Sequence, residues 1–295
     1  MTKRQFAVML VVVGVLLIAT ACAHRQASAR PAEFKIPDGW VVSPRNEKAE
    51  GEAGYRILHE ETGIELVYVP GGTFMMGSAD DDPDASSSEK PQHAHPVDAF
   101  WIGRTEVTVG QWRSVMGSVP GQYADSPYHA KYNDQGDDHP VVMVTWEDCQ
   151  EFCHKLGLEL PTEAQWEYAA RGPENRVYPW GNKWDKAKCC NGQDRGPDDR
   201  TSPVGSFPQG ASWCGALDMA GNVLEWCADW YEHVYKSYAQ GDFTPPSTGA
   251  FRVLRGGDWF SSNPRDYRCA YRDHYISGEI IDRASNVGFR CARGL

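Results

Sequence analysis

The apolar positions of this chain come in short runs that turn-forming residues separate. Residues 64–69 (Ile-Glu-Leu-Val-Tyr-Val) predict a strand, which ends at Pro-Gly-Gly (70–72) and resumes over residues 73–76. Residues 252–255 and 287–290 predict two later strands.

Three positions carry the signature of a helix N-terminus. In each, a threonine precedes by three residues a side chain that can accept a hydrogen bond from the threonine's backbone N–H. The pairs are Thr108 and Gln111, Thr145 and Asp148, and Thr162 and Gln165. The second helix is predicted to run to about Leu156 and to end at Gly157, and the third to end near Gly172. Beyond Gly172, turn-forming residues predict long irregular connections.

The N-terminus has the pattern of an export signal. Lys3 and Arg4 precede an apolar run over residues 6–21, which ends in the small residues Ala-Thr-Ala before Cys22. We expect a signal peptide over residues 1–21, and Cys22 in this position is similar to the lipidated cysteine of bacterial lipoproteins. The alternative is an ordinary cleaved signal with an incidental cysteine.

The remaining chain is predicted to be a lipid-anchored domain on a tether. Residues 22–60 contain scattered prolines and charges with little apolar periodicity, which is typical of a tether, and residues 61–295 are the right size for one domain. Ala23 replaces the aspartate associated with inner-membrane retention. We therefore expect an outer-membrane lipoprotein that faces the periplasm or the cell surface.

The charge of the mature chain argues against a nucleic-acid partner. The net charge of −11 becomes −13 without residues 1–21, because these contain two basic and no acidic residues. We expect the partners to be an exported peptide, protein or glycan, and the membrane only through the N-terminal lipid.

Eight cysteines remain after Cys22, and an even number in an oxidising compartment predicts disulfides. Metal ligation is the alternative, and Cys149 and Cys153 have the i, i+4 spacing for it, although no CxxC pair occurs. His93 and His95 are two residues apart in an extended segment, so they should share one face of a strand; we expect surface or structural histidines.

A series of motifs between residues 64 and 293 resembles one known family. The motifs are VYVPGGTFMMG (67–77), TEVT (105–108), PVVMVTW (140–146), LPTEAQWEYAARG (160–172), YPWG (178–181), MAGNVLEW (219–226), LRGG (254–257) and GFR (288–290). In this order they resemble the formylglycine-generating enzyme (sulfatase-modifying factor) family. The resemblance implies an α/β (α+β) fold, a C-type-lectin-like roll with little regular secondary structure.

The resemblance also shows where this chain departs from the family's enzymes. In those enzymes two cysteines after Arg-Gly-Gly hold copper(I), to which soft thiolates are suited. Here Ser261 aligns with the first cysteine, the second has no counterpart, and Asp258 replaces the serine usual after the glycines. We therefore expect no copper, and we disfavour formylglycine synthesis.

The family's disulfides and calcium sites carry over in part. Cys153 and Cys291 match a bridged pair, whereas the usual partner of Cys269 falls at Ala170. The partner of Cys269 stays open among Cys149, Cys189, Cys190, Cys214 and Cys227. The family's calcium loops match Asn222 and Glu225, and more loosely Asn191, which predicts structural calcium; the alternative is that these side chains only cap loop backbone.

Three functions fit these observations. The first is a non-catalytic or divergent binding module, with a cleft formed by residues 258–268, 271–283 and 189–214. Its candidate ligand residues are Asp258, Trp259, Phe260, Ser261, Arg265, Tyr267, Tyr271, His274 and Tyr275. Packing in the core is the alternative role for the aromatic residues among them.

The second function is a family enzyme acting on an exported peptide or protein, with a carboxylate in place of the cysteine pair. Its candidate catalytic residues are Asp258, Ser261, Asp266 and Asp273. The third is a retroelement-diversified ligand-binding protein of the lectin fold, in which residues 273–276 would be variable ligand contacts.

Overall fold

A five-stranded antiparallel sheet joins the beginning of the domain to its end. The computed structural model describes residues 35–118, 120, 135–194, 200–276 and 283–295, and residues 35–295 form one compact unit. The strand order is β1-β2-β3-β6-β11. The bounds are β1 Trp40–Val42, β2 Arg56–His59, β3 Ile64–Val69, β6 Phe100–Gly103 and β11 Ala292–Gly294.

Because of this sheet, the domain starts at an earlier residue than predicted. β1 and β2 pair with each other and with β3, and Trp40 and Ile57 are buried in the core. Residues 40–59 are thus part of the folded unit rather than of a tether that ends at residue 60. The predicted signal peptide, Cys22 and Ala23 lie outside the described residues.

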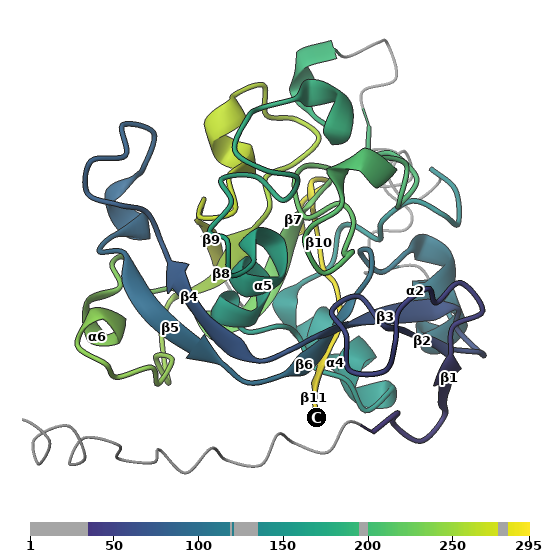
Figure 1. Ribbon diagram of the computed structural model, residues 1–295. Helices are drawn as coiled ribbons and strands as arrows, with labels where there is room; N and C mark the ends of the chain where they lie inside the picture. The colour runs from purple at the N-terminus through teal and green to yellow at the C-terminus, as the bar shows by residue number, and fades with distance from the viewer. Residues whose placement is uncertain (1–34, 119, 121–134, 195–199, 277–282) are drawn as a thin grey trace, which may run out of the picture. The chain divides into compact units, whose positions relative to one another are not determined.

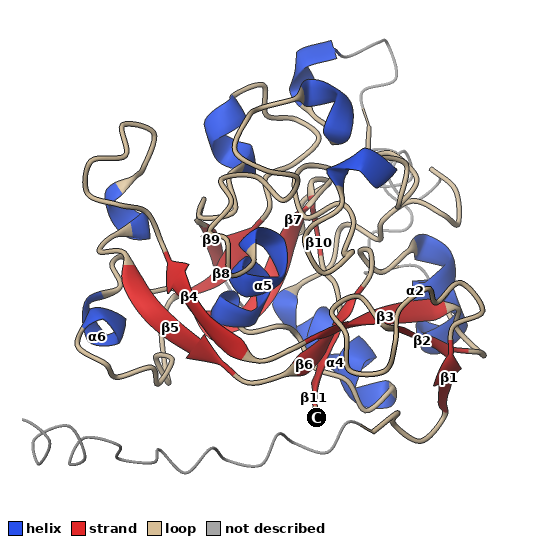
Figure 2. Ribbon diagram, viewed as in Figure 1, coloured by secondary structure: helices blue, strands red, loops and turns tan. Residues whose placement is uncertain are grey.

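Two further sheets build the rest of the domain. The first has the order β10-β7-β8-β9, and the second is the hairpin β4–β5 (Figure 2). Their bounds are β4 Gly72–Met76, β5 His93–Val97, β7 Leu224–Trp230, β8 Phe251–Arg255, β9 Asp273–Ile276 and β10 Val287–Gly288. β10 is shorter than predicted, and the sequence pattern did not indicate β11.

The three predicted helices form with the predicted caps. They are α2 Val109–Met116, α4 Trp146–Lys155 and α5 Glu163–Arg171, each with a complete capping box. The other elements of the described residues are a short helix, α6 Lys236–Ala239, and the 3₁₀ turns η1 Ser87–Glu89, η2 Lys186–Lys188, η3 Gly192–Asp194, η4 Pro208–Gly210 and η5 Pro264–Tyr267. Few helices and long loops agree with the predicted mixed α+β class.

Helix α5 lies at the centre of the unit. It contacts the hairpin β4–β5 on one side and β7 and β8 on the other (Figure 1). Trp166 and Tyr168 of this helix share a core cluster with Val67 of β3 and Val253 of β8. Among the described residues, no helix is long and apolar enough to cross a membrane.

Candidate functional site

A polar cleft opens where the chain leaves β8. We call it the Asp258 cleft; its volume is about 400 Å³, and it is lined by Leu224, Gly257, Asp258, Phe260, Ser261, Ser262, Asn263, Asp266, Tyr271 and Asp273. Most of these residues belong to the loop between β8 and β9, within the predicted ligand-binding segment. Part of that segment, residues 277–282, and part of the predicted loop 189–214, residues 195–199, lie outside the described residues.

Close backbone packing shapes the floor of the cleft. Gly257 has φ +70°, and a Cβ at this position would stand 2.5 Å from the carbonyl oxygen of Asp266. The Arg-Gly-Gly motif therefore allows the loop to fold back on itself, because only glycine tolerates both the positive φ and the close approach.

Two aromatic residues predicted to contact ligand are instead buried under this loop. Trp259 is 5% exposed and donates from Nε1 to the carbonyl of Ser285, and Tyr267 is fully buried. The Tyr267 hydroxyl donates to the Asp258 carbonyl at 2.9 Å. The core-packing alternative therefore describes these two residues. The sequence could not single them out, because an irregular loop has no periodicity that would distinguish its inner side chains from its outer ones.

Asp258 shapes the loop through its carboxylate. Its Oδ1 accepts from the backbone N–H groups of Phe260 and Ser261, both at 2.8 Å, and its Oδ2 accepts from Asn286 Nδ2. The side chain is 8% exposed. With both oxygens engaged, Asp258 is better suited to hold the loop than to act as a base.

The remaining candidate catalytic residues are Ser261, Asp266 and Asp273, and in the cleft they form two pairs with the help of the ligand candidate Tyr271. Ser261 Oγ donates to Asp266 Oδ2 at 2.5 Å, and the Tyr271 hydroxyl donates to Asp273 Oδ2 at 3.3 Å. Burial, and then the negative charge of Asp273, raise the pKa of Tyr271, so this phenol stays protonated and can donate. The structure thus brings Ser261, Asp266, Tyr271 and Asp273 together in one cleft.

Three other predicted ligand residues do not line this cleft. Arg265 Nε donates to the carbonyl of Asp84 and so holds the acidic loop before η1. The ring of His274 stacks on Tyr231, with centroids 4.2 Å apart. Tyr275 is exposed on β9, on the segment proposed as variable contacts.

The donor atoms of the cleft do not fit copper(I). The lining side chains supply carboxylate, hydroxyl and amide oxygens, and no thiol is among them. Copper(I) prefers soft sulfur ligands. Across the described parts of the chain, no group of three or more His, Cys, Asp or Glu side chains has the arrangement of a metal site.

The predicted calcium loop also has its side-chain oxygens engaged. Arg290 donates to both oxygens of Glu225 at 2.6 Å, and Trp166 Nε1 adds a third hydrogen bond. Asn222 Oδ1 accepts from the Ser202 N–H, and Asn191 Oδ1 accepts from the Gln193 N–H. The bonds of Asn222 and Asn191 to loop backbone are those of the capping alternative, whereas Glu225 pairs with Arg290. Calcium binding stays a prediction.

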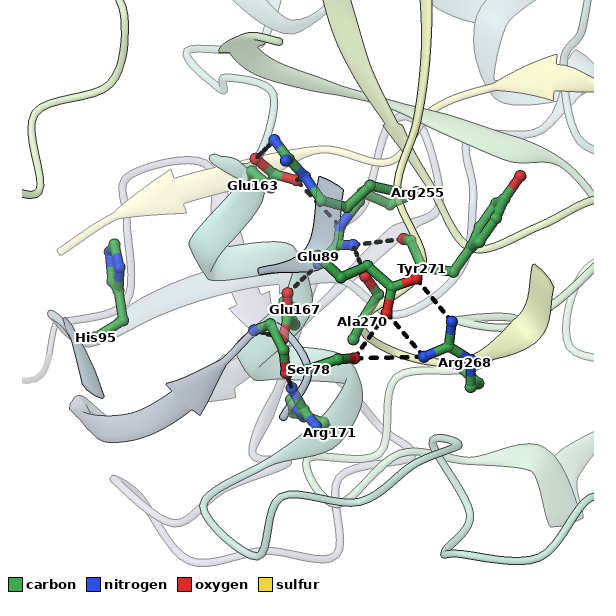
Figure 3. A network of polar contacts seen from close by, with 12 residues as sticks. Ser78, Glu89, His95, Glu163, Glu167, Arg171, Arg255, Arg268, Ala270 and Tyr271 are labelled. Carbon is green, nitrogen blue, oxygen red and sulfur yellow. Dashed lines mark hydrogen bonds and ion pairs between the residues drawn. The ribbon is translucent and has the colours of Figure 1, made fainter. Parts of the chain in front are cut away.

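A buried ionic network joins helix α5 to β8 and to the loop between β8 and β9 (Figure 3). Arg171 donates to Glu167 Oε1 at 2.6 Å, and Arg255 donates to Glu167 Oε2 and to the carbonyls of Ala270 and Tyr271. Although burial acts in the opposite direction, the charges of Arg255 and Arg171 lower the pKa of Glu167.

The same network continues into the 3₁₀ turn η1 and the residues after η5. Arg268 donates to both oxygens of Glu89, and Arg272 donates to both oxygens of Glu163. The partners in these two pairs come from segments far apart in the sequence, so no local pattern indicated them. The residues themselves stand in the family motifs, which was the available signal for Glu163, Glu167 and Arg255.

His93 and His95 share one face of β5, as predicted, and both are buried. His93 Nε2 and His95 Nδ1 are 3.2 Å apart, and the rings pack against Tyr238. Burial, and then the charge of His93, lower the pKa of His95 to about 4. Of the two predicted roles, surface or structural, the buried position of this pair agrees with the structural one.

The predicted disulfide partners face each other. The sulfurs of Cys153, on α4, and Cys291, before β11, are 3.7 Å apart, and the eight described cysteines are free thiols. Cys269 lies in the same core cluster as Cys214 and Cys227, so its partner remains open among the predicted residues.

We expect Cys153 and Cys291 to form a disulfide when the folded protein is exposed to an oxidant. Only a small approach of the two sulfurs is needed to reach the bonded distance of about 2.05 Å. The bond should stabilise the fold by roughly 2–4 kcal/mol. Mass mapping of cystine peptides, with a Cys153→Ser control, checks this; a linkage of Cys153 to Cys149 instead would contradict it.

The fold and the cleft define a lectin-like α+β domain whose site is built on loops. Residues 57–295 match the sulfatase-modifying factor enzyme 1-like domain family. The chain belongs to this family, which is the one that the sequence motifs indicated.

Known relatives and a solved structure agree. The chain is 33% identical to a formylglycine-generating enzyme of Streptomyces coelicolor, over 77% of this chain and 88% of that one. It is 36% identical to a protein of Chlamydia caviae named serine/threonine-protein kinase pkn1, over 78% of this chain; the match spans only 38% of that relative's length. The structure of PvdO from Pseudomonas aeruginosa superposes with a TM-score of 0.68 and 27% identity, over 83% of this chain and 99% of that one. The predicted C-type-lectin-like fold is confirmed.

Proposed function

We propose that this protein is an exported lipoprotein that uses the Asp258 cleft to bind a ligand and does not form formylglycine. The observation that carries the proposal is the position of Ser261. It lies in the cleft at the place aligned with the first copper-binding cysteine of the family's enzymes, and its hydroxyl is bonded to Asp266. A hydroxyl in this place does not provide the thiolate that copper(I) needs.

The ligand that suits this cleft is an exported peptide, protein or glycan with exposed polar groups. Carboxylate and hydroxyl groups line the cleft, and the ring of Phe260, which is 68% exposed, adds an apolar surface at its edge. A few polar groups beside an exposed aromatic ring are typical of recognition sites. Attachment through a lipid on Cys22, to the outer membrane, would place this cleft in the periplasm or at the cell surface.

Copper-loaded protein should leave the cysteine of a sulfatase-type peptide unchanged in air. The reason is the oxygen-only donor set of the cleft. Mass spectrometry of the peptide detects an aldehyde at the cysteine if it forms. A formylglycine-generating enzyme run beside it serves as the positive control, and formation of the aldehyde by this protein would contradict the proposal.

Binding to peptide and glycan arrays should depend on the cleft. Phe260→Ala and Asp273→Asn change lining residues that are exposed or half-buried. We expect each substitution to lower the affinity for ligands found on the arrays by about tenfold. Phe251→Ala, at an exposed position of β8 that does not line the cleft, is the matched control. Equal binding by the native protein and all three variants would place the ligand elsewhere.

A further inference from the structure

A second pocket lies on the first sheet, apart from the Asp258 cleft. We call it the Arg104 pocket; its volume is about 350 Å³, and it is lined by Pro44, Arg45, Leu58, Gly63, Glu65, Arg104, Thr105, Gln111 and Val204. These residues belong to β2, β3, the start of α2 and the adjoining loops. In Figure 1 this group of elements is well separated from β8 and β9. The two linings have no residue in common.

The guanidinium of Arg104 lacks a full complement of partners in this pocket. Its Nε is buried and has no hydrogen-bond partner, and its Nη1 lies 3.6 Å from Glu65 Oε2, beyond hydrogen-bonding distance. The other oxygen of Glu65 accepts from the Ser43 hydroxyl. Glu65 therefore compensates the charge of Arg104 only in part.

Two more arginines add positive charge around the pocket. Arg45 lines it, and Arg56 lies beside it and donates to the Arg45 carbonyl. Burial lowers the pKa of Arg104, and the charges of Arg56 and Arg45 lower it further, against the opposing charges of Glu65 and Asp218. The lowered pKa of Arg104 and its long distance from Glu65 both indicate an excess of positive charge around the pocket.

The neutral polar groups of the pocket are already engaged. Gln111 accepts from the Thr108 N–H and donates to the Gly63 carbonyl, and the Thr105 hydroxyl donates to the Glu106 carbonyl. The donors available to a ligand are thus the guanidinium groups. Guanidinium N–H groups match the geometry of phosphate and sulfate oxygens, often in bidentate pairs.

We propose that the Arg104 pocket binds a small oxyanion, a phosphate or sulfate group, between Arg104 and Arg45. The cavity is at the small end of the range of ligand pockets and is larger than the oxyanion itself. It therefore accepts the group either as a free ion or as part of an ester. This site is independent of the proposed function of the Asp258 cleft.

Titration calorimetry with inorganic phosphate and with sulfate tests the site. Residues 23–295, which include the whole compact unit and lack both the signal peptide and the lipid anchor, are used at low ionic strength. We expect saturable binding of one ion, weakened at least tenfold by Arg104→Gln and by Arg45→Gln. Glu65→Gln should tighten binding several-fold, because it removes the one negative charge in the lining. Arg176→Gln, at a surface arginine paired with Glu174, is the matched control and should change nothing.

A second arm separates a free ion from an ester-linked group. Phosphatidylcholine vesicles with and without phosphatidic acid are sedimented with the same proteins. Binding that needs phosphatidic acid, Arg45 and Arg104, without binding of the free ions, supports the site and identifies the phosphate of a lipid headgroup as its ligand. Arg45 is exposed, so Arg45→Gln keeps the test valid if Arg104→Gln fails to fold. Absence of binding in both arms, or binding that none of these substitutions changes, would overturn the proposal.

Discussion

Arg290→Met should lower the free energy of unfolding by about 3–5 kcal/mol, because it leaves a buried charge without its counter-charge. Arg290 and Glu225 are both fully buried, and Arg290 also donates to the carbonyls of Gly103 and Leu217. Although burial lowers it, the charge of Glu225 raises the pKa of Arg290 above its ordinary value. In the variant Glu225 would keep only the Trp166 indole as a partner. Urea denaturation followed by tryptophan fluorescence measures the loss.

The matched control for this substitution is Arg113→Met. Arg113 pairs with Asp137 at 2.7 Å, but both side chains are largely exposed, so its loss should be below about 1 kcal/mol. The double variant Glu225→Leu/Arg290→Met should recover much of the stability, since it removes both buried charges. Similar losses for Arg113→Met and Arg290→Met would show that the buried pair has no special role.

The second large effect concerns Asp229, at the end of β7. Burial, and then the negative charge of Glu163, raise the pKa of its carboxyl to about 7, although the Glu163 N–H donates to it at 2.5 Å. The folded state thus binds this proton more tightly than the unfolded state does. The stability from this proton is fully present below about pH 4 and is lost as the pH rises through about 7.

Asp229→Asn keeps a hydrogen-bond acceptor and removes this titration. As the pH rises from 4 to 8, the native protein should lose on the order of 4 kcal/mol of unfolding free energy relative to the variant. The reason is that the pKa of Asp229 is about three units higher in the folded state than in the unfolded state. Denaturant unfolding at several pH values measures this difference. Asp242→Asn, in an exposed turn, is the control, and parallel pH profiles for the native protein and Asp229→Asn would contradict the assignment.

The sequence predicted features that depend on neighbouring residues and missed those that depend on distant ones. Each capping box joins residues three apart, so Thr108, Thr145 and Thr162 were recognised and form the predicted helix starts. The strand at residues 64–69 was visible because its apolar run is long. β1 and β11 have three residues each, which is too little for a periodic signal, and β11 pairs with the distant β6.

The candidate site was predicted in its location but not in its detailed contacts. The family motifs directed attention to the loop after Arg255, and the Asp258 cleft lies there. The inward orientation of Trp259 and Tyr267 follows from hydrogen bonds to Ser285 and Asp258 that only the folded chain reveals. The Glu225–Arg290 pair likewise joins two motifs that were recognised separately, and it was this pairing that engaged the predicted calcium ligand.

The pairing of β11 with β6 sets the order of events during synthesis. Ala292 pairs with Ile102, so one edge of β6 has no partner until nearly the whole domain has been made. At about 5–20 residues per second, that interval is roughly ten to forty seconds. An unpaired strand edge can pair with other chains during such a delay. The domain should therefore need protection from aggregation until β11 is in place, and a shortened chain that lacks β11 should be a substrate for quality-control proteases.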